Sequence, residues 1–345
     1  MTTSISFPQH APERMHSAKM PVTTDIKENK QVMSLQDMKL SIQPQFQADP
    51  YTYAQQLLDS NSHLLPSPKS DSYVLLGENS VSTDADKTME ASRQLGRNLK
   101  QSSDAHGAAA SRVKRAVADA GEVGTPPHIE ALEDLISSIH DDYQTNYAKI
   151  NEGAAKFMKD VNTALGTISN FISAGKDGKI VFEAEDFAKS LHKGLQGYTV
   201  YSVQNTNDYK EWSQWNNDTI PIHIFKGDEK TLDFWTKKLG DGFIVRRPPH
   251  TSDEITIQVV PNLEPIRNVF SSISNIKGPW NGNEMQSQVF QSLQTAIDSQ
   301  KSSVNNSVSQ LLERFRQDNS TFETMIQLLT KMTEDLHRYN AGYFQ

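Results

Sequence analysis

Residues 290–339 read FQSLQTAIDSQKSSVNNSVSQLLERFRQDNSTFETMIQLLTKMTEDLHRY, without a proline or a glycine. Alternate steps of four and three residues from Phe290 reach fifteen positions, of which twelve are apolar or aromatic. These positions are Phe290, Gln294, Ile297, Lys301, Val304, Val308, Leu311, Phe315, Asp318, Phe322, Met325, Leu329, Met332, Leu336 and Tyr339. A seven-residue repeat that stays in phase this long predicts one long helix with a narrow apolar seam facing another helix.

A second stretch, from Ile129 to Phe171, follows the same stepping. Eleven of its thirteen positions are apolar or aromatic, so it supplies the partner that the last helix needs. We predict that the two helices form a long intramolecular antiparallel coiled coil. The seam residues expected to meet are Ile136, Tyr143, Tyr147, Ile150, Phe157, Val161, Ile168, Phe290, Ile297, Val304, Val308, Leu311, Phe315 and Phe322.

Polar residues interrupt the last helix's seam at Gln294, Lys301 and Asp318. Polar seam positions commonly set register and partner at a cost in stability. Alternatively they are solvent-exposed sites where another part of the chain leaves the helix, which we favour for Lys301 and Asp318.

His140 lies on the seam of the first helix beside Asp141 and Asp142. We interpret it as a hydrogen-bonded seam histidine. A metal-binding or pH-sensing cluster is the alternative, because imidazole and carboxylate groups serve both purposes.

Residues 176–280 have a different character. A Lys-Asp-Gly-Lys turn at 176–179 leads into a strand at 180–182, and further short strands and helices alternate up to Gly278 and Pro279. We predict strands at 198–203, 243–245 and 255–260, and helices at 185–195, 228–239 and 263–276. This segment reads as a small α+β domain with a mostly antiparallel sheet, inserted between the two long helices.

The first 124 residues divide into two regions. Residues 1–45 are rich in Ser, Thr, Gln, Lys and Pro, a composition typical of disorder. Residues 46–124 are intermittently helical, and we expect two short helices at 84–101 and 105–120 to form a helical hairpin. The whole chain is therefore predicted to be mainly α with a small α+β insert. The predicted divisions are 1–45, 46–124, 125–175, 176–280 and 281–345.

Composition excludes several functional classes. The chain of 345 residues has no cysteine, which removes disulfides, thiolate metal sites and cysteine nucleophiles. A net charge of −8 argues against nucleic acid as a partner. No phosphate-binding glycine-rich loop and no HExxH motif is present, so we predict neither an enzyme nor a cofactor. No stretch approaches the ~20 apolar residues that span a bilayer, and the N-terminus lacks the apolar core of a cleavable signal.

Three stretches carry a resemblance to a known family. ISSIHDDY at 136–143, followed by Tyr147, is similar to the pattern Ile-Ser-x-Ile-x-Asp-x-Tyr-x-x-x-Tyr. The turn at 175–178 matches a turn in the same place. FQSLQTAIDSQ at 290–300 resembles aromatic-Gln-Ala-Trp-Gln-Ser-Gly-Phe-x-Ala-Gln, although Leu293 stands where relatives carry Trp. The ordered set resembles the needle-tip proteins, or hydrophilic translocators, of bacterial type III secretion systems (the IpaD, SipD and BipD group).

This resemblance implies a protein exported through the needle without signal cleavage, cytoplasmic before export and then held at the needle tip on the bacterial surface. It implies a ring of about five copies that controls secretion, senses host contact and supports insertion of the hydrophobic translocators into the host membrane. The implied partners are the needle subunit, the translocators, other copies of the chain and a host small molecule such as a bile salt. In this family the N-terminal hairpin masks the coiled coil before assembly. The implied needle-contact residues are Leu329, Met332, Leu336 and Tyr339.

A different class of protein also fits part of the pattern. A cytosolic coiled-coil scaffold or adaptor that is never exported would explain the heptads and the missing cysteines, but not the ordered motifs. Export that depends on residues 1–45 would distinguish the two.

Overall fold

The computed structural model describes residues 50–60, 85–119, 127–200, 219–248 and 255–343. The chain divides into two units, Met1–Ser41 and Ile42–Gln345, and every described residue belongs to the second. The export region predicted at 1–45 and the end of the N-terminal region at 120–124 lie outside the described residues. Within the described ranges, no helix is long and apolar enough to cross a membrane. The mainly helical fold with small antiparallel sheets, predicted from the sequence, is confirmed.

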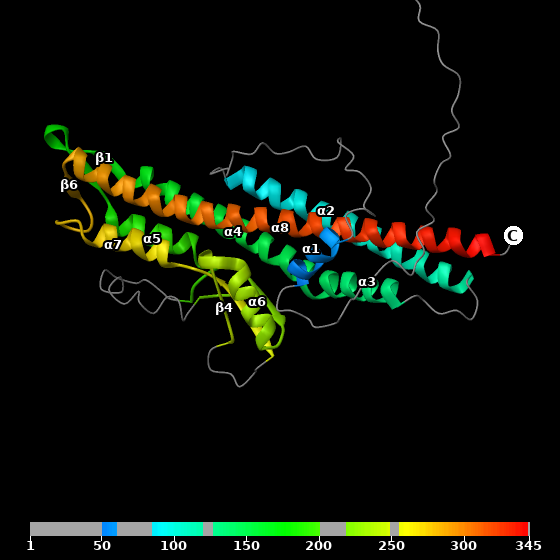
Figure 1. Cartoon of the computed structure of the whole chain (residues 1–345). Helices are drawn as coiled ribbons and strands as arrows, with labels where there is room; N and C mark the ends of the chain where they lie inside the picture. The colour runs from blue at the N-terminus through cyan, green and yellow to red at the C-terminus, as the bar shows by residue number, and fades with distance from the viewer. Residues whose placement is uncertain (1–49, 61–84, 120–126, 201–218, 249–254, 344–345) are drawn as a thin grey trace, which may run out of the picture. The chain divides into compact units, whose positions relative to one another are not determined.

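The helix α8 runs without interruption from Ser287 to Tyr343. Alongside it lie three consecutive helical elements, α3 (Pro127–Ser138), the π-helical η3 (Ile139–Gln144) and α4 (Thr145–Gly166). The ring centroids of Tyr147 and Phe315 are 4.8 Å apart. Asn162, further along α4, bonds the earlier Asn305 of α8. The two long helical stretches therefore run antiparallel (Figure 1).

The predicted seam residues lie along this contact. All except Tyr143 and Ile168 are at most 5% exposed, and those two are partly exposed. Among the polar seam positions, Gln294 is exposed and Lys301 is partly exposed, but Asp318 is only 7% exposed. The interpretation of Asp318 as a solvent-exposed site is wrong, because Lys238 supplies a buried partner for its carboxylate.

The first long helix departs from the predicted shape at two places. The six residues of η3 widen the helix into a π-helix, which is rare and occurs mostly as a single turn inside an α-helix. At the other end, a 3₁₀ turn, η4 (Thr167–Phe171), gives way to a strand, β1 (Ile172–Ala174). The left-handed residues of the following turn are Asp177 (φ 53°) and Gly178 (φ 74°).

Two helices come from the N-terminal region, α1 (Pro50–Ser60) and α2 (Ala85–Asp119). The predicted break between residues 101 and 105 is wrong, because α2 is continuous over 35 residues. No proline or glycine lies between Gly96 and Gly107. The Ser102 hydroxyl lies 3.0 Å from the carbonyl oxygen of Asn98 in the preceding turn, an arrangement that serine adopts inside helices without ending them.

The described parts of the segment between the long helices hold three α-helices and most of the described strands. Its helices are α5 (Ala184–Gly194), α6 (Glu229–Leu239) and α7 (Glu264–Ser274). Asp228 caps α6 by accepting from the Thr231 amide over 2.9 Å. The helix α5 contacts α4, whereas α7 contacts α8 (Figure 1). Both therefore bury an apolar face against the long helices.

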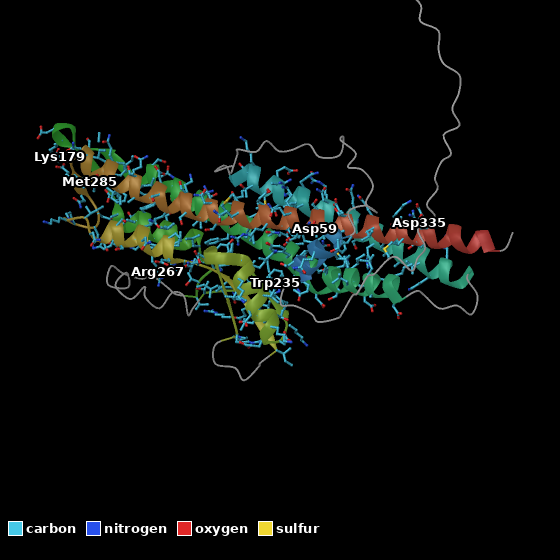
Figure 2. All side chains as sticks on the ribbon, in the orientation of Figure 1. Asp59, Lys179, Trp235, Arg267, Met285 and Asp335 are labelled. Carbon is cyan, nitrogen blue, oxygen red and sulfur yellow. The ribbon has the colours of Figure 1, made fainter. Side chains whose placement is uncertain are left out.

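The strands form two separate three-stranded antiparallel sheets rather than one. One sheet has the order β1-β2-β6, with β2 at Ile180–Phe182 and β6 at Asn283–Met285. The other has the order β3-β5-β4, from His223–Lys226, Thr256–Pro261 and Phe243–Arg246. The first sheet joins the end of one long helix to the start of the other, because β1 follows η4 and β6 precedes α8. In Figure 2, Lys179 and Met285 lie at this end, and Asp335 marks the far part of α8.

Candidate interaction site on the last helix

The last described part of α8, which we call the α8 terminal segment (Thr321–Asp335), is covered on nearly every side. Only Gln327 and Glu334 are exposed within it. Residues on the seam are buried, and so are residues next to seam positions. In a contact between only two helices, those neighbouring positions would be exposed to solvent. The buried residues are Phe322, Met325, Ile326, Leu328, Leu329, Met332 and Thr333.

The covering elements are α1, α2 and α3, each of which contacts α8. The face of α2 that is turned inward follows steps of four and three residues, as the long helices do. Its positions are Thr88, Ser92, Leu95, Leu99, Ser102, His106, Ala109 and Val113. Most of these side chains are small or polar, so α2 buries little apolar area for its length.

Hydrogen bonds attach α2 to α8 at one point of this face. The Ser102 hydroxyl donates to Glu323 Oε1 over 2.9 Å, and Asn319 Nδ2 donates to the same oxygen over 2.8 Å. Ser102 is 3% exposed and Asn319 is 5% exposed. These two hydrogen bonds replace water as partners of Glu323 Oε1 where α2 packs on α8.

The first long helical stretch contains two buried amides without partners among the described residues, one at the end of η3 and one in α4. Lys159 pairs with Asp86 over 3.3 Å, and His140 approaches Ser103 over 2.9 Å, so α2 runs antiparallel to α4. Gln144 and Asn151 lie between these two contacts in the sequence. They are 0% and 1% exposed, and within the described ranges neither amide has a hydrogen-bond partner. An unsatisfied buried polar group costs about 1–3 kcal/mol, so the packing around these two amides is weaker than its buried area suggests.

An aromatic cluster connects α6 to the long helices at the level of η3. The indole of Trp235 is fully buried and meets Tyr147 edge-on, at a centroid distance of 5.3 Å (Figure 2). Phe234 packs edge-on against Tyr143 at 4.8 Å. Tyr51 of α1 reaches the same Tyr143 at 6.3 Å. The cluster therefore joins α1, α6 and the first long helix.

One ion pair lies beside this cluster. Lys238 Nζ lies 2.9 Å from Asp318 Oδ1 and 2.8 Å from Oδ2, and it also sits 4.9 Å from the ring centroid of Tyr51. Arg314 donates to the Lys238 carbonyl over 2.8 Å. Together these contacts fix the end of α6 to α8, and the Tyr51 ring adds α1 to the same point.

The predicted needle-contact residues divide into two groups. Leu329 is 0% exposed and Met332 is 3% exposed, so both are buried within the chain. Leu336 and Tyr339 belong to α8, but their side chains are outside the described set. The structure therefore places two of the four residues where a partner reaches them only after the cover moves.

Sequence reasoning missed the residues that attach α2 and α6, chiefly Ser102, His106 and Lys238. The stepping on α2 was a usable signal, since its positions repeat every seven residues. It was hidden because serine, threonine and histidine occupy positions where apolar residues usually mark a seam. For Lys238 no local signal exists, because its partner is 80 residues away.

Other site types are less well supported among the described residues. There, no group of three or more His, Asp or Glu side chains could hold a metal ion. A groove of about 510 Å³ lies where α7, β6 and the start of α8 meet. Its apolar floor is formed by Met285 and Leu293, and Val289 is 46% exposed at its side.

Comparison with known proteins gives the family. The model of the type III secretion systems tip complex components matches residues 7–334. The chain belongs to this family. The needle-tip resemblance drawn from the sequence motifs is confirmed. Members of this tip complex family are structural parts of a secretion system rather than enzymes.

Individual relatives agree with the family match. The translocator protein BipD of Burkholderia mallei (strain NCTC 10229) is 23% identical over 228 residues, which cover 66% of this chain and 61% of BipD. BipD of Burkholderia thailandensis is 21% identical over 231 residues, covering 67% and 62%. The chain thus matches somewhat less than two thirds of the length of these curated relatives.

A solved structure shares the fold. BipD, a component of the type III secretion system of Burkholderia pseudomallei, superposes with a TM-score of 0.52 at 17% identity, covering 84% of this chain and 94% of that chain. The similarity in fold agrees with the assignment of this chain as a tip complex component related to BipD.

Proposed function

We propose that this chain caps the needle of a type III secretion system as a small oligomer of about five copies. In this role it holds secretion in check, senses host contact or a host small molecule such as a bile salt, and supports insertion of the hydrophobic translocators into the host membrane. It is cytoplasmic before export and is then secreted to the needle tip. The family match over residues 7–334 supports this proposal.

The observation that carries the proposal furthest is the covered α8 terminal segment. A tip protein has to bind the needle subunit only after export, so its contact surface benefits from a cover in the isolated chain. Leu329 and Met332 are buried, and α1, α2 and α3 all contact the helix that carries them. We infer that these N-terminal elements act as a self-chaperone and that their displacement exposes the needle contact.

The composition of the α2 interface supports displacement. Its inward face carries Thr88, Ser92 and Ser102, all buried, in place of large apolar residues. Gln144 and Asn151 of the first long helical stretch are buried without a described partner. Such an interface is held by a small free energy, whereas the α4–α8 seam buries Phe157, Phe315 and other large side chains. Binding of the needle subunit can therefore replace α2 while the seam stays closed.

A tethered chain tests this proposal. The protein has no cysteine, so Ser102→Cys and Glu323→Cys create a unique pair at a point where α2 meets α8. Bridging the pair with a short bis-maleimide should abolish binding of purified needle subunit in a pull-down or calorimetric assay. The same variant without the bridge should bind, and bridging in needle-free buffer should leave the circular dichroism spectrum unchanged.

Two controls complete the test. A single Ser102→Cys variant treated with the reagent accounts for modification without a bridge. A secretion assay then asks whether the chain reaches the medium only when the secretion apparatus is intact. Equal needle binding by bridged and unbridged chains would contradict the masking role, and secretion without the apparatus would contradict the tip assignment.

A further inference from the structure

Two histidines from different elements meet against one aromatic ring. The rings of His106 on α2 and His140 on η3 have centroids 5.4 Å apart. Both face Phe322 of α8, at centroid distances of 6.3 Å and 6.0 Å. We call these three residues the histidine clasp. It lies where α2, η3 and α8 meet, at the edge of the α8 terminal segment.

The two histidines have different hydrogen-bond partners. His140 Nδ1 lies 2.7 Å from Asp141 Oδ1, and its Nε2 lies 2.9 Å from Ser103 Oγ. The carboxylate favours a proton on Nδ1 of His140. Among the described residues, the hydrogen-bond partner of His106 Nε2 is the Ser137 hydroxyl, at 3.4 Å. Burial lowers the pKa of His106, the charge of His140 lowers it further, and Asp141 acts weakly in the opposite direction.

Apart from His140 and Asp141, no charged group is found to act on His106 within the described part of the chain. On η3, Asp142 accepts from the Ser138 hydroxyl. On α8, Glu323 already accepts from Ser102 and Asn319. On α2, Asp104 is exposed to solvent.

On α3, Glu133 lies near Lys114 of α2, and burial raises the pKa of its carboxyl group. Acidification therefore acts through Glu133 in favour of the folded interface. Release on acidification has to come from the histidines.

We propose that the histidine clasp makes the docking of α2 pH-sensitive: acidification places a positive charge on His106, between the His140 and Phe322 rings, and releases α2 from η3 and α8. The docked state keeps His106 neutral, whereas an undocked α2 returns it to water and to an ordinary pKa of ~6.5. Docking is therefore fully favoured above about pH 6.5, and this contribution is lost as the pH falls below that value. Each unit that separates the two pKa values changes the docking equilibrium by up to ~10-fold.

The biological consequence rests on the proposed masking role: an acidic host compartment would uncover the α8 terminal segment. The physical claim is separate. It concerns the position of α2 in the isolated full chain and holds whether or not the needle is the eventual partner.

Spin labels can measure that position, because the chain has no cysteine. Lys100 on α2 and Gln327 on α8 are both exposed and lie outside the clasp, so Lys100→Cys and Gln327→Cys provide the label sites. Double electron–electron resonance then gives the docked and released populations of the full chain at pH 7.5 and pH 5.5.

Three further variants in the labelled background make the result decisive. His106→Gln is neutral at both pH values, and His106→Lys carries a charge at both. His192→Gln is the matched control, since burial also lowers the pKa of His192, but this residue lies on α5. We expect the docked population of the parent chain to fall severalfold at pH 5.5 and to recover at pH 7.5. His106→Gln should stay docked at pH 5.5, His106→Lys should be largely released at pH 7.5, and His192→Gln should behave like the parent.

Three outcomes would overturn the proposal. They are equal populations of the parent chain at both pH values, release of His106→Gln on acidification to the same extent as the parent, and full docking of His106→Lys at pH 7.5. A flat response would leave the needle-binding proposal untouched, because no needle subunit takes part in the measurement. Conversely, if the tethered-chain experiment failed, the distances between the spin labels would be unaffected, and the pH proposal would stand or fall on those distances alone.

Discussion

Lys238 on α6 and Asp318 on α8 form an ion pair in which both carboxylate oxygens lie within 2.9 Å of Nζ. The side chains are only 17% and 10% exposed. Each charge has lost most of its hydration and is stabilised by the other, so removing one partner would leave an uncompensated buried charge. It holds the inserted segment to the last helix beside the Tyr51 ring of α1.

Lys238→Met should therefore destabilise the protein by about 3 kcal/mol, since it leaves the Asp318 carboxylate buried without its cation. Urea denaturation followed by circular dichroism would measure the loss. Lys237→Met is the matched control, because Lys237 is the exposed neighbour on the same helix, and it should change the free energy of unfolding by less than ~0.5 kcal/mol. Equal midpoints for the two variants would show that the pair contributes nothing.

A second prediction concerns the register of the long helices. Asn162 Nδ2 donates to Asn305 Oδ1 over 3.0 Å, and Asn305 is 1% exposed. Asn305→Leu should cost about 1–3 kcal/mol, because it leaves the Asn162 amide without this acceptor. Adding Asn162→Leu should recover much of that loss. A double-mutant cycle measures the coupling, expected at ~0.5–3 kcal/mol, and additive effects would contradict it. Asn306→Leu, at the exposed next position, is the control.

A third prediction concerns acid sensitivity of the inserted segment. Burial, aided by the charge of Lys149, lowers the pKa of His223 to about 4, and its Nε2 donates to Asn146 Oδ1 over 2.9 Å. A folded-state pKa below the unfolded value of ~6.5 means that the neutral form stabilises the fold. This stability is present above pH 6.5 and is lost as the pH falls from 6.5 toward 4.

After allowance for the partial exposure of His223, we expect roughly 1–2 kcal/mol to depend on its titration. His223→Gln keeps a donor for Asn146 and should flatten the decline in unfolding free energy between pH 6.5 and pH 4. Urea titrations at several pH values would test this. An unchanged slope would contradict a role for His223, and His192→Gln gives the corresponding value for a second buried histidine.

A fourth prediction separates stability from partner binding on the α8 terminal segment. Leu329 is 0% exposed, so Leu329→Ala should leave a cavity and cost about 2–5 kcal/mol. Gln327→Ala, two residues earlier and exposed, should be nearly neutral. Thermal unfolding would show the difference. A neutral Leu329→Ala would mean that the cover over this segment is already open in solution.

The sequence predicted the two long helices well, because a seven-residue apolar repeat marks the buried face of each. The in-phase seams from Ile136 to Ile168 and from Phe290 to Phe322 required two long helices facing each other, and nearly all of these positions are buried. The strands at 180–182, 243–246 and 256–261 were readable because short apolar runs follow clear turn residues.

The remaining features depend on contacts that no local pattern records. The two sheets could not be told from one, because β2 pairs with β6 a hundred residues later. The continuous helix α2 packs along both α8 and α4, long-range contacts that its local sequence does not record. The burial of Asp318 depends on Lys238, and the cover over Leu329 and Met332 depends on a helix whose inward face is small and polar.

The position of α8 after α2 and α4 in the chain also governs the order in which these helices can pack. Ser102 meets Glu323 only 221 residues later, and Asn162 meets Asn305 only 143 residues later. During synthesis, α2 and α4 can contact each other as soon as both have been made, but neither can pack on α8 until that later helix has followed. Contacts between such distant segments also form slowly. The pair formed by α4 and α8 therefore stays open while the chain before α8 is being made, and a transport machine that engages the chain at that stage has no closed long-helix pair to pull apart.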